Sequence, residues 1–181
     1  MFTNCNKKML SMAGSSVDKY GKDQTGKITY NFDTYGFREG NDYNTIPSVV
    51  FFGCSYVAGI GVKANERFTN YFDDSWNFGL FGEYTEEELL INYNSFTKKY
   101  HDHKLCKIVF CWKSTDIDQL KSFITSIGDD ENIYHTVPVN FKLDKYKLMR
   151  NLENIDYDIS GTHYGPRSHL KFSKLLWHFL K

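Results

Sequence analysis

The chain has 181 residues, in which 22 Lys and Arg balance 22 Asp and Glu, and aromatic residues make up 17% of the total. This length corresponds to about one domain of ~100–200 residues, and the aromatic content can supply a core, which excludes wholesale disorder. A formal net charge of zero argues against a general nucleic-acid binder, which needs a basic surface.

The sequence predicts neither a membrane span nor a signal peptide. No apolar run approaches the ~20 residues that cross a bilayer, and no apolar segment follows Lys7 and Lys8 as a signal peptide would require. The four cysteines form no CxxC pair, so we expect reduced thiols in a cytoplasmic protein. We therefore expect neither a membrane nor a nucleic acid as a partner, and the sequence leaves the oligomeric state open.

The first third of the chain changes from a polar arm to strand and helix patterns. Residues 1–27 are rich in Ser, Gly, Lys and Asp and predict a flexible N-terminal arm, so that 28–181 form the single domain. Alternation over residues 27–32 predicts a short strand. The continuous apolar and β-branched run 48–53 is typical of a strand buried on both faces. Apolar spacing over 65–72 predicts a helix.

The rest of the chain alternates between strands and helices. Thr85 and Glu88 form a capping box that opens a predicted helix. Further strands are expected over 75–78, 107–112 and 133–139, and further helices over 116–127, 143–152 and 166–180. This alternation predicts an α/β fold, a three-layer α/β/α sandwich with a short, mostly parallel sheet.

Ser55 is the first candidate for chemistry. The predicted buried strand delivers Gly53 and then Ser55 to its carboxyl end, where ligands bind in open α/β sheets. The segment does not fit a P-loop, because Gly53 and Gly59 lie one residue too far apart, and it lacks the third glycine of a dinucleotide fingerprint. It also lacks the second glycine of a G-x-S-x-G elbow, where Val57 stands instead.

His163 is the second candidate, in a loop just before the last predicted helix. An imidazole within reach of Ser55 would act as its general base. Taken alone, a serine after a strand is more often a turn residue, and a loop histidine is more often solvated. The two are informative only as a pair at opposite ends of one α/β chain.

The two segments together resemble the SGNH (GDSL-like) hydrolase family, particularly bacterial and phage members. Gly53-Cys54-Ser55 stands where the family has Gly-Asp-Ser, residues 31–38 are similar to its upstream segment, and residues 161–166 are similar to its histidine loop. The resemblance implies that Ser55 is the nucleophile and His163 the base. It also implies an oxyanion hole formed by Ser55, by Gly82 with Gly79 as the alternative, and by Thr115.

Two positions depart from the family pattern. Ser160 stands where the family places the aspartate of the triad, and Asp158 would share a face with Ser160 in an extended segment. Asp158 therefore substitutes for that aspartate, or the enzyme uses a Ser–His dyad; losing the carboxylate costs on the order of 10⁴ in kcat. Thr115 stands where the family has Asn, and losing one oxyanion donor costs ~10²–10³.

The resemblance implies a serine esterase or acylhydrolase without cofactor or metal, acting on an ester of a small molecule, a glycan or a lipid. One alternative is a catalytically degenerate domain of this type that binds a ligand or glycan. Another is an unrelated α/β domain in which Ser55 and His163 do not meet. His101 and His103 form an H-x-H pair without further metal ligands nearby, and His169 is expected on a helix surface.

Overall fold

The computed structural model describes most of the chain after the N-terminal arm: residues 28, 30–33, 35–38, 40–80, 85–112, 116–137, 146–150, 156–157 and 163–181. The predicted arm over 1–27 lies outside the described residues. So do four candidate site residues: Gly82, Thr115, Asp158 and Ser160.

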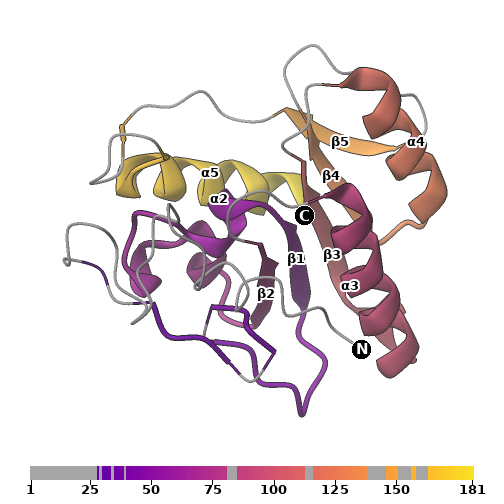
Figure 1. The fold of residues 1–181 in the computed structure, drawn as a ribbon, viewed down its shortest axis with the longest axis horizontal. Helices are drawn as coiled ribbons and strands as arrows, with labels where there is room; N and C mark the ends of the chain where they lie inside the picture. The colour runs from indigo at the N-terminus through magenta and orange to yellow at the C-terminus, as the bar shows by residue number, and fades with distance from the viewer. Residues whose placement is uncertain are drawn as a thin grey trace.

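A five-stranded parallel sheet forms the centre of the molecule (Figure 1). The strands lie in the order β2-β1-β3-β4-β5. In register, Phe52 of β1 aligns with Phe78 of β2 and with Phe110 of β3. The strand bounds are β1 Val49–Gly53, β2 Ser75–Gly79, β3 Lys107–Cys111, β4 Ile133–Val137 and β5 Lys147–Arg150. The predicted α/β fold class is confirmed.

Helices cover both faces of the sheet. In Figure 1, α3 and α4 lie on one side of the strands and α2 and α5 on the other. The helices are α2 Ser55–Ala58, α3 Glu86–Lys99, α4 Ile117–Ile127 and α5 Pro166–Phe179. Short 3₁₀ turns occupy η1 Ala64–Glu66, η2 Phe68–Tyr71 and η3 His103–Leu105.

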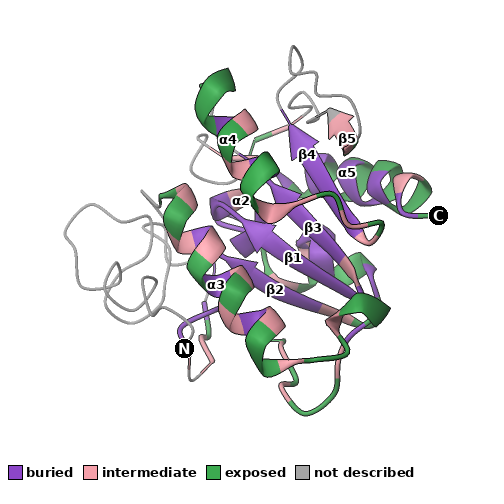
Figure 2. Cartoon of the chain, turned by 90° about the vertical axis from the view of Figure 1, so that its right-hand side faces the viewer, coloured by how far each residue is buried: buried purple, intermediate pink, exposed green. Residues whose placement is uncertain are grey.

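Each face of the sheet carries its own core, because neighbouring residues of a strand point to opposite faces. Phe52 packs with residues of α3 and α4, and Phe51 packs with residues of α2, η2 and α5. Figure 2 shows the consequence: the central strands are buried along their length, while α3 and α4 expose their outward sides. β1 is buried at every position, as its continuous apolar sequence predicts.

Local signals in the sequence set where two of the helices begin. The Thr85 N–H donates to Glu88 Oε2 at 3.0 Å, which fixes the start of α3. The Asp116 carboxylate accepts from the N–H groups of Asp118 and Gln119 and caps α4. Both starts agree with the predicted helices.

Three predicted elements were wrong. Residues 65–72 form two 3₁₀ turns instead of a helix, because the backbone at Arg67 is extended between them. Residues 147–150, within the predicted helix 143–152, form the edge strand β5, paired with β4. The segment expected as a strand over 27–32 joins no described strand; Phe32 forms only an isolated antiparallel bridge with Arg38.

The strand order changes direction beside β1. The chain crosses from β1 to the outer strand β2, then returns past β1 to β3 on the other side. In open α/β sheets, ligands bind at this change of direction, at the carboxyl ends of the strands. Ser55 lies at that end, separated from β1 only by Cys54.

Candidate functional site

Gly53 allows the chain to turn from β1 into α2. A Cβ at this position would lie 2.5 Å from Val57 Cγ2 and 2.8 Å from the Cys111 carbonyl oxygen. No larger residue fits without moving β3 or α2. Ser55 is the first residue of α2 and is only 8% exposed.

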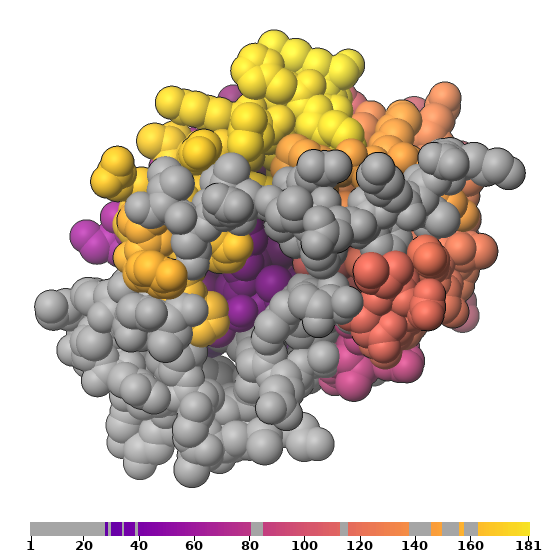
Figure 3. Space-filling model, turned by 90° about the horizontal axis from the view of Figure 1, so that it is seen from above, coloured from indigo at the N-terminus to yellow at the C-terminus, as the bar shows by residue number. Residues whose placement is uncertain are grey.

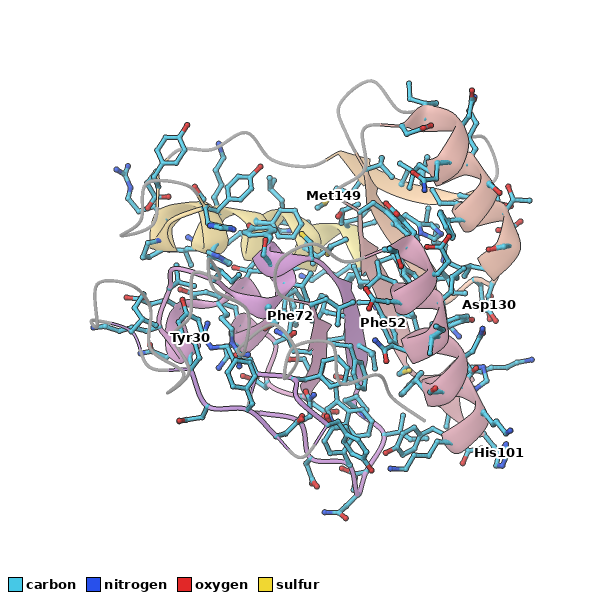
Figure 4. The ribbon with its side chains drawn as sticks, viewed as in Figure 1. Tyr30, Phe52, Phe72, His101, Asp130 and Met149 are labelled. Atoms are coloured by element: carbon cyan, nitrogen blue, oxygen red, sulfur yellow. The ribbon has the colours of Figure 1, made fainter. Side chains whose placement is uncertain are left out.

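Arg38 and Tyr30 hold the loop that follows α2. The buried Arg38 guanidinium donates to the carbonyl oxygens of Ala58, Gly59 and Val62, the last at 2.8 Å. It also lies 4.5 Å from the ring centroid of Tyr30. The Gly61 N–H donates to the Tyr30 hydroxyl at 2.7 Å; Tyr30 is labelled in Figure 4. A buried charge needs such partners, and here they fix the backbone behind Ser55.

Sequence reasoning missed this clamp. Arg38 belongs to the upstream segment that resembles the SGNH family, but the sequence assigned it no role. Arg38 lies in a glycine-containing segment, and no acidic residue at helical spacing marks a partner for it. Nothing in the sequence therefore indicates that its guanidinium binds carbonyl oxygens 20 to 24 residues away.

His163 lies at the other end of the chain, in the segment before α5. It is half-buried and directly precedes Tyr164, which forms an antiparallel bridge with Tyr157. The bridge places Tyr157 and Tyr164 side by side. In the sequence, Asp158 directly follows Tyr157, and His163 directly precedes Tyr164.

Tyr56 joins the two segments. Its ring centroid lies 4.5 Å from that of Tyr164 and 4.5 Å from that of His169, and Phe172 of α5 packs against it at 5.1 Å. The residues directly after Ser55 and directly after His163 are therefore in contact. Burial raises the pKa of the Tyr56 hydroxyl, and nearby Cys111, Tyr164, Cys54 and Asp156 add to that shift.

The same surroundings keep Tyr164 protonated. Burial raises the pKa of Tyr164, and Cys54 and Tyr157 raise it further. Both phenols beside the candidate site are therefore neutral at physiological pH, and neither supplies a base. His163 remains the titratable side chain that sequence reasoning assigned to proton transfer.

Among the described residues, no hydrogen bond joins the Ser55 hydroxyl to His163. Catalytic hydrogen bonds are often long in an enzyme without substrate and tighten when substrate binds.

The carboxylate of Asp156, in the same region, binds the first turn of α5. Asp156 Oδ1 accepts from the Ser168 N–H at 2.7 Å and the Ser168 hydroxyl at 2.6 Å, and Oδ2 accepts from the Arg167 N–H at 2.9 Å. Burial alone would raise the pKa of Asp156, but these hydrogen bonds lower it below its usual value. Asp156 therefore caps α5 from outside the helix, and its oxygens are engaged there.

His169 is buried rather than exposed, which corrects the prediction. Its Nδ1 accepts from the Phe68 N–H at 3.1 Å, and its ring stacks on Phe68 with centroids 5.9 Å apart. The helical face that carries His169 also carries Phe172 and Leu176, which pack against the sheet. The helical spacing of apolar residues could not by itself show that His169 lies on the apolar face of α5.

Gly79, the alternative oxyanion donor, is engaged within the fold. Its N–H donates to Asn77 Oδ1 at 2.8 Å. A Cβ there would lie 2.2 Å from the Ala58 nitrogen, so Gly79 allows α2 to pack closely on β2. Gly82 and Thr115, the other two predicted donors, and the predicted acids Asp158 and Ser160 lie outside the described residues.

One face of the molecule is hollowed. Figure 3 shows purple atoms from the first part of the chain at the floor of this hollow, beside the orange-to-yellow C-terminal part. A separate polar cavity of about 240 Å³ lies along the outer edge of β2 and includes neither Ser55 nor His163. Its lining includes Asn41, Arg67, Thr69 and Asn77.

The described part of the chain contains no group of three or more His, Cys, Asp or Glu side chains that could hold a metal ion. At the H-x-H pair, His103 Nδ1 lies 2.9 Å from the Tyr100 carbonyl oxygen. None of the described helices is both long enough and apolar enough to cross a membrane.

Comparison of this chain with protein-family models, with curated proteins and with solved structures finds no match. The function of the protein is therefore inferred from the site itself.

Proposed function

We propose that the protein is a serine ester hydrolase of the SGNH type, with Ser55 as nucleophile and His163 as general base. The observation that carries this proposal is the ring contact between Tyr56 and Tyr164 at 4.5 Å. Each ring belongs to the residue next to one of the two candidates, so the contact brings together segments 108 positions apart in the chain.

The topology supports the same assignment. Ser55 follows the inner strand β1 at the sheet's change of direction, where α/β proteins bind ligands. The Arg38 clamp and the close fit at Gly53 and Gly79 hold the turn around Ser55 in one conformation. Such rigidity is what a nucleophile needs if its attack geometry is to be set before substrate arrives.

The proposed reaction is acyl transfer in two halves. Ser55 Oγ attacks the ester carbonyl carbon while His163 accepts the hydroxyl proton. The tetrahedral oxyanion is held by the Ser55 N–H and by the predicted donors Gly82 and Thr115. His163 then returns the proton to the leaving alcohol as the C–O bond breaks. Water, deprotonated by His163, attacks the acyl-enzyme, and the carboxylic acid leaves as Ser55 regains its proton.

Asp158 is the proposed orienting carboxylate. It directly follows Tyr157 and His163 directly precedes Tyr164, so the bridge between the two tyrosines supports their proximity. Asp156 cannot take this role without losing its contacts to the start of α5, because its oxygens already accept three hydrogen bonds there. Ser160, at the usual position of the acid, would leave a Ser–His dyad.

The test is hydrolysis of p-nitrophenyl acetate together with labelling by a fluorophosphonate. We expect wild type to turn over the ester and to carry the label on Ser55. Ser55→Ala should lose both, with a fall in kcat of at least about 10³. Ser126→Ala is the matched control, because Ser126 is an exposed serine on α4. Labelling that persists in Ser55→Ala would contradict the proposal.

Asp158→Asn then separates a triad from a dyad. An orienting carboxylate predicts a loss on the order of 10⁴ in kcat, whereas a dyad predicts little change. His163→Gln should abolish turnover in both cases, since it removes the base.

A second candidate function is a ligand- or glycan-binding domain that has kept the scaffold without turnover. It is favoured by the 8% exposure of Ser55, which leaves little of this side chain open to a substrate. A folded protein with neither turnover nor labelling would support this candidate and contradict the first.

A further inference from the structure

The outward side of α5 carries only positive charge. From residue 159 to the end, the chain has four Lys and Arg and no Asp or Glu. All four cations are exposed, on α5 or directly after it: Arg167, Lys171, Lys174 and Lys181. Among the described residues, none of them forms an ion pair with a carboxylate. The zero net charge of the whole chain therefore hides a basic surface at this helix.

Large apolar side chains border these cations. Leu170 is 37% exposed, Leu175 45% and Trp177 51%. At about 100° per residue, Leu170 and Trp177 lie on one flank of the helical cations and Leu175 on the other. The Lys181 Nζ lies 5.6 Å from the Trp177 ring centroid. We call the four cations and these three apolar residues the α5 face.

The α5 face is formed before any partner arrives, because the other side of the helix is fixed. Phe172 and Leu176 are buried in the core on that side of the sheet. The ring of Trp177 also packs against Phe72, with centroids 5.9 Å apart. Figure 2 shows that the outward side of α5 is exposed. A preformed surface binds without the entropic cost of folding a segment.

The mixture of charged and apolar groups distinguishes between partners. A nucleic acid would pair with the cations and stack on Trp177, but it would leave Leu170 and Leu175 in water. The surface of an anionic membrane accommodates every group: its phosphates attract the cations, tryptophan favours the headgroup level, and leucine reaches the boundary of the acyl chains. The stems of Lys and Arg lie along such a boundary with their charges in the headgroups.

We propose that the α5 face binds the surface of membranes that contain anionic lipids, with α5 lying flat on the membrane. The sequence predicted no membrane partner, because the net charge is zero and no apolar run is long enough to span a bilayer. Neither criterion applies to a helix that lies on the surface, where one basic and partly apolar face is sufficient. This binding is a property separate from ester hydrolysis.

The test is sedimentation of the protein with sucrose-loaded vesicles of phosphatidylcholine, with and without about 30 mol% phosphatidylglycerol. We expect binding to the anionic vesicles, weaker binding to the neutral ones, and release as salt screens the charges. The double variant Lys171→Gln, Lys174→Gln should bind about 20- to 30-fold more weakly, since each cation at an anionic surface contributes about fivefold.

Two control variants should bind as wild type does. Lys98→Gln with Lys104→Gln changes the net charge equally, but these exposed lysines lie on α3 and η3, and α3 is on the opposite side of the sheet from α5 (Figure 1). Ser55→Ala keeps the α5 face and removes the proposed nucleophile, so failure of the hydrolase proposal and failure of membrane binding are distinguishable.

Tryptophan emission reports which face meets the lipid. Trp76 and Trp112 are each 2% exposed, so a blue shift on adding vesicles, and quenching by brominated lipids, are expected from Trp177. Trp177→Phe should lose both signals and keep most of the binding. Leu175→Ser should weaken binding about three- to tenfold, because it removes a partly exposed apolar side chain. Thermal melts show that each variant is folded.

Four results would overturn this assignment. The first is sedimentation with anionic vesicles no greater than with neutral ones. The second is an equal loss in the two double lysine variants, which would indicate a general effect of charge. The third is binding without a change in Trp177 emission, which would place the contact elsewhere. The fourth is equal competition by a single-stranded oligonucleotide together with unchanged binding by Leu175→Ser, which would make the α5 face a site for polyanions.

Discussion

At the scale of single residues, His135 is a base enclosed in an aromatic core. It lies on β4 and is 1% exposed, and its ring stacks on Phe110 with centroids 5.6 Å apart. Its Nδ1 accepts from the Trp112 Nε1–H at 3.1 Å, so the proton of the neutral ring is on Nε2. Among the described residues, Nε2 has no hydrogen-bond partner. Burial lowers the pKa of His135 to about 3.

This histidine makes the stability of the protein depend on pH. Between the unfolded value of about 6.5 and the folded value of about 3, the unfolded chain binds a proton at His135 and the folded protein does not. The free energy of unfolding therefore falls as pH decreases through this range, by about 1.4 kcal/mol per pH unit below 6.5. Urea unfolding at pH 7, 6 and 5 measures this.

His135→Gln is the informative variant. It keeps an acceptor for Trp112 and removes the titrating group, so its stability should vary less between pH 7 and pH 5 than that of wild type. His178→Gln, at an exposed histidine of α5, should behave as wild type. Equal pH dependence in wild type and His135→Gln would contradict the buried neutral state.

At the scale of elements, α5 depends on a residue outside it. Proline at its first position removes one unsatisfied N–H, and Asp156 accepts from two of the others, on Arg167 and Ser168. The sequence predicted α5 within one residue of its observed end, because Phe172 and Leu176 repeat at helical spacing. The sequence could not predict this cap, since Asp156 lies well before the first residue of the helix, Pro166.

Asp156→Ala should destabilise the protein by about 1–2 kcal/mol, the usual cost of losing a helix cap. Because the folded pKa of Asp156 is lowered, its stabilising effect is present above the unfolded value and is lost as pH falls through the folded one. Urea unfolding of the variant at neutral pH measures this cost. Asp129→Ala, at an exposed position beyond α4, is the control and should change stability little.

The other elements show why short segments are hard to predict. The runs that became β1 and β3 are apolar at nearly every position and read clearly as buried strands. β5 has Lys147 and Arg150 at its ends and only partly buried residues between them. Its sequence therefore lacks the continuous apolar run that identifies a buried strand. Pairing with β4 decides its conformation, and pairing is a property of the fold.

At the scale of the whole molecule, one sheet supports two cores. Adjacent residues of β1, such as Phe51 and Phe52, belong to opposite cores. Loss of either core exposes one face of every central strand, so neither can persist alone. We therefore expect a single cooperative unfolding transition.

Far-UV circular dichroism and tryptophan fluorescence test this expectation, because Trp76 and Trp112 are buried in the core under α3 and α4. The two signals should give the same midpoint in urea, and Phe172→Ala in the other core should shift both midpoints together. A fluorescence transition that stays in place in Phe172→Ala, or that separates from the loss of secondary structure, would show two independent units.

The sequence by itself determined the fold class, four of the five strands, the helices α3, α4 and α5, and the choice of Ser55 and His163 as candidates. It could do so because burial on two faces, helical spacing and capping are written in neighbouring residues. Only the tertiary structure decided that Arg38 clamps the loop behind Ser55, that His169 is buried, that Gly79 is a packing residue, and that α5 leaves its cations and Trp177 exposed. Each of these depends on contacts between segments that are separated in the sequence. The amino-acid sequence does not show which of these segments meet, because the folded sheet brings them together.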